Sequence, residues 1–112
     1  MANIETESVS QALVCNLGVM NLAERARYIS LSRKLRGASD ERLELGDGYA
    51  FRLAAAKISL LEIAEWIGFE RRCCPFFNLQ IEAQANDGPI WVRISGAAGV
   101  KQFILAEIGG AS

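Results

Sequence analysis

The sequence predicts an α+β protein of two layers, with an antiparallel sheet of four or five strands and helices packed on one of its faces. Two helices open with capping patterns, and two Asp-Gly turns separate stretches of alternating apolar residues. The helix-then-hairpin unit also occurs twice along the chain. Hairpins make a sheet antiparallel, and amphipathic helices bury their apolar stripes against it. The predicted order is therefore β-α-β-β-α-β-β-α.

Length and composition place this fold in one domain. A chain of 112 residues with 51% hydrophobic residues fits a single core. Residues 1–11 are polar and acidic, unlike a secretory signal, and are predicted to form a flexible tail, with the domain over residues 12–112. No apolar run reaches the ~20 residues of a membrane helix, and a net charge of −1 argues against a nucleic-acid partner. We therefore expect a cytoplasmic protein that binds neither membranes nor nucleic acids.

The first strand and the first helix are expected at the start of the domain. Alternating apolar residues predict a strand over residues 12–17. Asn21 and Glu24 have the spacing of a capping box, which predicts a helix start. The apolar stripe runs to about Leu35, and Gly37 is expected to end the helix.

Two hairpins are predicted from their turn residues. Asp47-Gly48 lies in the middle of the alternating stretch 42–54, and this pair is a strong signal for a tight turn. Asn86-Asp87-Gly88 lies between two further alternating stretches, 79–84 and 90–94. The four strands of these hairpins form the body of the predicted sheet.

Two more helices are expected. Ser59 and Glu62 form a second capping box, and Pro75 disfavours helical geometry at the residue before it, so this helix should stop near Cys73. The last helix is predicted over residues 100–108, with Gly109-Gly110 ending it.

The two helix-hairpin units are similar in sequence. Residues 28–34 match residues 66–72 at a spacing of 38, with aromatic, apolar and basic residues in the same places. Residues 49–53 match residues 90–94 at a spacing of 41, after an Asp-Gly turn in both copies. The sequence therefore predicts an internal pseudo-repeat.

The cysteines are the residues with the most distinctive chemistry. The chain has no histidine, which excludes histidine bases, Cys-His nucleophile pairs and most catalytic zinc sites. Cys73 and Cys74 stand at a predicted helix end, and Cys15 lies on the predicted first strand. An odd number of cysteines in a chain of this size favours reduced thiols. If Cys15 approaches the helix end, its sulfur should lie within about 4–5 Å of Cys73 or Cys74, and thiolates select soft metal ions.

Two interpretations of this cluster follow from its surroundings. Cysteine is often a small apolar core residue, so the pair can simply fill the space between helix and hairpin. Arg71 and Arg72 favour a reactive thiolate, whereas burial and the negative helix end oppose it. Glu70, one turn earlier, is costly to bury unless paired, either with an arginine such as Arg33 or Arg52 or as a base or ligand beside the thiols.

The uncovered face of the sheet is a candidate contact surface. Alternation puts Trp91, Arg52 and Arg93 there, and tryptophan and arginine are enriched in interfaces. This composition predicts a homodimer, although a lone surface tryptophan needs no partner. The glycine-rich stretches 46–48 and 95–99 lack the context of phosphate loops, so no cofactor is expected.

Two classes of function remain open. One is a soft-metal or metalloid-binding or thiol-based protein that uses Cys73, Cys74, Cys15 and Glu70. The other is a non-enzymatic dimeric interaction or small-ligand-binding module with its cysteines packed in the core. The sequence does not decide whether the protein is an enzyme.

One motif resembles a known group. The stretch 70–76, Glu-Arg-Arg-Cys-Cys-Pro-Phe, with residues 47–52 and 90–101, resembles a family of small uncharacterised bacterial proteins with a Glu-Arg-x-Cys-Cys-Pro-Phe motif. The likeness covers about residues 12–106. It implies no established activity.

Overall fold

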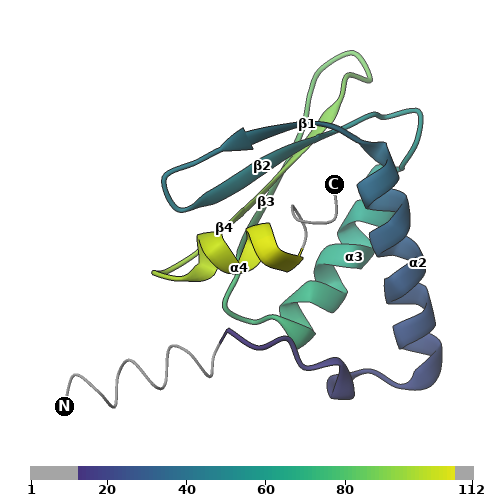
Figure 1. Ribbon diagram of the computed structural model, residues 1–112. Coiled ribbons are helices and arrows are strands. Elements are labelled where there is room, and N and C mark those ends of the chain that lie inside the picture. Colours follow the sequence, from purple (N-terminus) through teal and green to yellow (C-terminus); the bar gives the residue numbers. More distant parts are fainter. Residues whose placement is uncertain (1–12, 108–112) are drawn as a thin grey trace.

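The computed structural model describes residues 13–107 and has the predicted α+β architecture (Figure 1). Its elements, in chain order, are the 3₁₀ helix η1 (Leu17–Val19), α2 (Leu22–Ala38), β1 (Ser39–Glu44), β2 (Gly48–Leu53), α3 (Leu60–Cys73), β3 (Asn78–Ala83), β4 (Ile90–Ser95) and α4 (Val100–Glu107). The four strands form one antiparallel sheet in the order β1-β2-β4-β3. Both Asp-Gly pairs lie at hairpin turns, as predicted.

The helix starts follow from the capping residues. Asn21 and Glu24 exchange side-chain and backbone hydrogen bonds at the start of α2, and Ser59 and Glu62 do the same at α3. These reciprocal bonds satisfy amides that the first helical turn leaves without partners. α3 ends at Cys73, as expected from Pro75.

The predicted first strand is wrong. Residues 13–16 have no strand structure and lead into η1, so the sheet has four strands within the described part of the chain. The reason lies in the hydrogen bonds of Asn16. Its backbone N–H donates to the carbonyl of Cys73 at 2.8 Å, and its side chain accepts from Gly18 at 2.9 Å. The segment is therefore held at the end of α3, and not along a strand.

The predicted end of the first helix is also wrong. α2 continues through Gly37 to Ala38. Ala38 is buried in the core, and its carbonyl accepts a hydrogen bond from the backbone of Ala54 at 2.9 Å. This packing outweighs the weak helix preference of one glycine. Ile108, the Gly109-Gly110 stop and the tail predicted over residues 1–11 lie outside the described residues.

The sheet displays the predicted repeat. Its order is symmetric, because the second strands of the two hairpins, β2 and β4, pair at the centre. Phe51 pairs with Val92, which is its own counterpart in the second unit, 41 residues later. The two hairpins are thus related by an approximate local twofold axis between these residues.

The helices cover one face of this sheet. α2 and α3 lie side by side, and α4 packs against β2 and β4 (Figure 1). The core between the layers contains Leu31, Leu35, Phe51, Leu53, Ile63, Trp66, Val92, Ile94 and Ile104. Arg52 pairs with Trp91, and Ala50 with Arg93, on the other face, as the alternation predicted. None of the helices within residues 13–107 is long and apolar enough to cross a membrane.

Candidate functional site

The three cysteine sulfurs lie together. Cys15 forms a disulfide with Cys74, with 2.00 Å between the sulfurs and 59 residues between the two positions. The free thiol of Cys73 lies 3.5 Å from the sulfur of Cys74. The distance expected between Cys15 and the helix end is confirmed, but the expectation of three reduced thiols is wrong in this structure. The number and positions of the cysteines in the sequence could not identify which two are bonded, because the disulfide depends on how a distant segment folds back.

The backbone positions these sulfurs at the end of α3. Cys73 is the last residue of the helix, and Cys74 caps it by donating its N–H to the carbonyl of Glu70 at 2.7 Å. Both side chains are buried, and Met20 packs against them. Cys15 reaches them from the segment before η1, which crosses the helix end.

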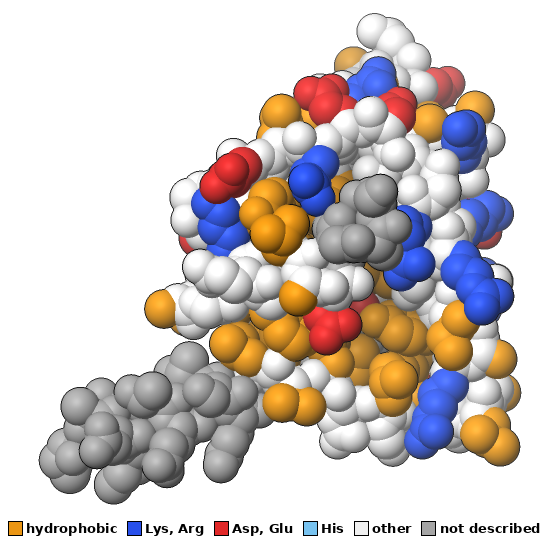
Figure 2. Space-filling view, viewed as in Figure 1, with side chains coloured by type: hydrophobic (Ala, Val, Ile, Leu, Met, Phe, Trp, Pro, Cys, Tyr) orange, Lys and Arg blue, Asp and Glu red, His pale blue; other side chains and the backbone are white. Residues whose placement is uncertain are grey.

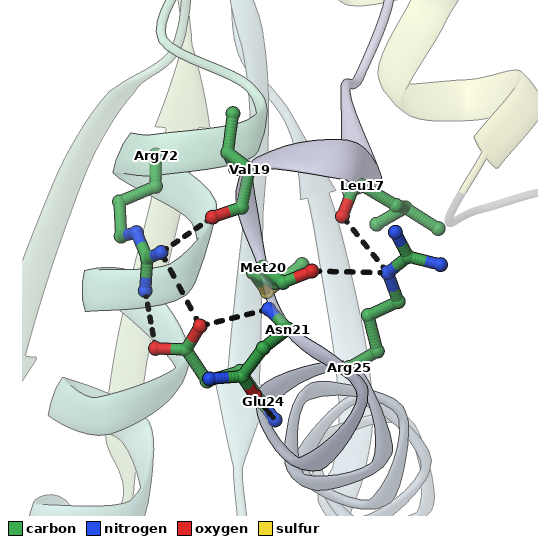
Figure 3. Close-up of polar contacts among 7 residues, drawn as sticks. All are labelled: Leu17, Val19, Met20, Asn21, Glu24, Arg25 and Arg72. Atoms are coloured by element: carbon green, nitrogen blue, oxygen red, sulfur yellow. Dashed lines mark hydrogen bonds and ion pairs between the residues drawn. The ribbon is translucent and has the colours of Figure 1, made fainter.

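Polar contacts hold the segment that follows Cys15 in place (Figure 3). Arg72 on α3 donates to the carbonyl of Val19 at 2.6 Å and to the carboxylate of Glu24 at 2.8 Å. Arg25 on α2 donates to the carbonyls of Leu17 and Met20 at 3.1 and 3.2 Å. None of these bonds involves the disulfide. They therefore favour the same position of the segment when the cysteines are reduced.

Glu70 is buried beside the sulfurs. Its side chain is 3% exposed, and the hydroxyl of Tyr28 donates a hydrogen bond to it. The predicted ion pair with Arg33 or Arg52 is wrong, since Arg52 pairs with Asp40 at 2.7 Å and Glu70 is bonded to the tyrosine. The ligand atoms of Glu70, Cys73 and Cys74 all lie within 4.8 Å of one another. The acid thus lies beside the cysteines, which is the alternative to an ion pair with an arginine that the sequence left open.

Burial sets the protonation of this cluster. It raises the pKa of Glu70 to about 7, against the opposing effect of the hydrogen bond from Tyr28. Burial, followed by the charge of Glu70, raises the pKa of the Cys73 thiol, and Arg72 lowers it by less. The pKa of Tyr28 is also raised, first by burial and then by Glu70. At neutral pH the site therefore holds a neutral thiol beside a partly ionised acid. Of the opposing effects that the sequence left open for this thiol, burial outweighs the arginine.

A cavity opens next to the disulfide. It has a volume of about 610 Å³ and lies between the segment before η1 and helices α2, α3 and α4. Cys15, Cys74, Tyr28 and Glu70 line it, but Cys73 does not. Most of its other walls are apolar, and Figure 2 shows hydrophobic side chains gathered on this side of the molecule.

No pattern in the sequence indicates this cavity. Ile29 has the spacing of the apolar stripe of its helix, but its side chain is 45% exposed and lines the cavity wall. Helical spacing cannot distinguish an apolar residue that is buried in the core from one that the fold leaves half exposed.

The sheet-face residues lie apart from the cysteines, on the side away from the helices. Trp91 is half-buried, and the two arginines beside it form ion pairs within the chain, Arg52 with Asp40 and Arg93 with Glu82 at 3.1 Å. Their role as an interface stays a prediction.

Comparisons with known proteins give no relative: no family model, no curated protein and no solved structure matches this chain.

Proposed function

We propose that the protein binds a soft metal or metalloid ion, such as arsenite or mercuric ion, through the thiolates of Cys15, Cys73 and Cys74. The observation that carries this proposal is the convergence of three sulfurs from two distant segments next to a buried carboxyl group. Thiolates are the ligands that soft ions prefer, and the chain has no histidine to direct the site toward harder metals.

The sulfur spacing suits a shared ion. Sulfurs that each lie about 2.3 Å from one metal, at bond angles near ~100°, are about 3.5 Å apart. Cys73 and Cys74 already have this separation, at 3.5 Å. Glu70 lies close enough to receive a thiol proton or, with an ion that takes more than three ligands, to act as a further ligand.

The disulfide is the oxidised form of this site. Two equivalents of a thiol reductant convert it to the thiols of Cys15 and Cys74 and leave as a disulfide themselves. Arsenite, As(OH)₃, then exchanges its three hydroxyl groups for the sulfurs of three thiols and releases three waters, which carry the three thiol protons, and arsenic stays trivalent. The bonds of Arg72 and Arg25 to the segment after Cys15 support this site by keeping the third sulfur nearby.

Native mass spectrometry tests the proposal. We expect the reduced protein to bind one arsenite or mercuric ion per chain, and each single Cys-to-Ser variant to lose arsenite. The unreduced protein is the matched control, because its disulfide leaves Cys73 as the free thiol. An absence of stoichiometric binding, with thiols labelled only after unfolding, contradicts the proposal and favours packed cysteines.

We also propose that the protein forms a homodimer through the outer face of the sheet. The supporting observation is that this face carries Trp91 among charges of both signs, with Arg52 and Arg93 each beside an acid. A surface with alternating charges can complement itself about a twofold axis. This second function, an interaction module, is independent of the cysteines.

A further inference from the structure

We propose that the site takes monosubstituted organoarsenicals, with arsenic bound to Cys15 and Cys74 and the organic group lying in the adjoining cavity. This inference rests on the proposed binding of soft ions and specifies the ligand further. It assigns a role to the cavity, which an inorganic ion would leave empty.

Two of the three sulfurs face the cavity. Cys15 and Cys74 line it, whereas Cys73, which is as buried as Cys74, does not. Trivalent arsenic with one carbon substituent has two positions left for sulfur. The pair at the cavity wall therefore matches the valence of such a compound, and the carbon substituent then points into the open space.

The cavity has the size and lining of a site for a small apolar group. Its volume of about 610 Å³ falls within the range of ordinary ligand pockets, which is about 300–1,000 Å³. Leu17, Ile29, Phe77 and Phe103 contribute to its walls, and the side chains of Leu17 and Ile29 are 42% and 45% exposed. An aromatic ring placed there would remove this apolar surface from water, which favours binding.

The binding step conserves atoms and electrons. A thiol reductant first cleaves the disulfide, as above. Phenylarsine oxide then reacts with the two thiols, forming two As–S bonds and releasing one water that carries both thiol protons and the oxide oxygen. The As–C bond stays intact and arsenic remains trivalent.

The test compares phenylarsine oxide with methylarsonous acid, which also takes two thiols but has a small organic group. Each is titrated into the fully reduced protein in competition with dithiothreitol. This dithiol has no cavity, so its own preference for the phenyl or the methyl compound serves as the reference. We expect the protein to favour the phenyl compound over the methyl compound by about tenfold more than dithiothreitol does, as burial of an aromatic ring predicts.

Variants of the cavity wall locate the organic group. Ile29→Trp fills the cavity from α2 and should abolish the extra preference for phenyl. Leu22→Trp is the matched control, because Leu22 lies on the same helix, is 81% exposed and does not line the cavity. It should leave the preference unchanged.

Variants of the sulfurs separate this inference from the proposed function. Cys73→Ser should keep phenylarsine oxide and lose arsenite, while Cys15→Ser should lose both. If the unsubstituted protein prefers the phenyl compound over the methyl compound no more than dithiothreitol does, while arsenite binds, the inference is overturned and the proposed function stands. If neither arsenite nor an arsenical binds the reduced protein, both are overturned.

Discussion

Tyr28 donates a hydrogen bond to Glu70 across the contact between α2 and α3. The indole N–H of Trp66 donates to the hydroxyl of Ser32 across the same contact, at 3.1 Å. Tyr28 and Trp66 are 38 positions apart, and so are Ser32 and Glu70, so the pseudo-repeat makes one contact twice. The first copy has a neutral hydroxyl where the second has a buried acid. The repeat thus diverges one turn before the cysteines.

This acid should make stability depend on pH. The pKa of Glu70 rises from 4.5 to about 7 on folding, so the folded state binds the proton more tightly than the unfolded state. Its contribution to the free energy of unfolding is therefore full below pH 4.5, falls between pH 4.5 and about 7, and is constant above. The loss is about 3 kcal/mol as an order of magnitude.

Glu70→Gln should remove this fall in the free energy of unfolding with pH. Urea unfolding at pH 5 and pH 8 is the measurement. The change in the free energy of unfolding caused by the substitution should be more favourable at pH 8 than at pH 5. Glu41→Gln, at an exposed strand position, is the control and should change neither value. Parallel pH profiles for the protein with and without Glu70 would show that the acid is not titrating in this range.

Tyr28→Phe should have a cost that depends on pH. The substitution leaves the Glu70 carboxylate without its donor, and an unsatisfied buried charge costs more than an unsatisfied neutral acid. We expect a loss of about 1–3 kcal/mol in the free energy of unfolding, larger at pH 8 than at pH 5. Ser32→Ala removes the equivalent partner of Trp66 and should have the same cost at both pH values. Equal pH behaviour of the two variants contradicts the assignment.

Arg72→Ala should weaken arsenite binding although it changes no sulfur. The variant loses the bond to the Val19 carbonyl and the ion pair with Glu24, so the segment after Cys15 is held less firmly. We expect a loss of about tenfold in the affinity of the reduced protein, equal to about 1.4 kcal/mol. Arg71→Ala, at the exposed neighbouring position, is the control and should keep full affinity. Equal affinities for both variants would show that Arg72 does not position Cys15.

The outer sheet face predicts a dimer. Light scattering at micromolar concentration should give twice the mass of the chain, and Trp91→Ala should give the mass of a monomer, because it removes the large aromatic side chain of this face. A protein that stays monomeric at high concentration rules out self-association. A dimer that survives Trp91→Ala places the interface elsewhere.

Features set by neighbouring residues could be predicted from the sequence. The Ser59–Glu62 capping box spans three residues, and Pro75 acts on the residue before it, so both ends of α3 followed from local rules.

Features set by distant residues could not be predicted in the same way. The partner of Cys74 lies 59 residues away, and the partner of Glu70 is Tyr28, 42 residues away. The segment 12–17 has strand-like residues, but the bond from Asn16 to Cys73 decides the conformation of its described part, from Leu13 on. The sequence therefore identified the members of the cluster, while the fold supplied the disulfide, the tyrosine and the cavity.

The central claim is that Cys15, Cys73 and Cys74 form one soft-ion site, and X-ray absorption at the arsenic edge tests it most directly. With arsenite bound to the reduced protein, the account predicts three sulfur neighbours around each arsenic and no remaining oxygen neighbour. Cys15→Ser, which should lose arsenite, should show no protein-bound arsenic with three sulfur neighbours. Arsenic that keeps its oxygen neighbours, or that keeps three sulfurs in Cys15→Ser, would contradict the account.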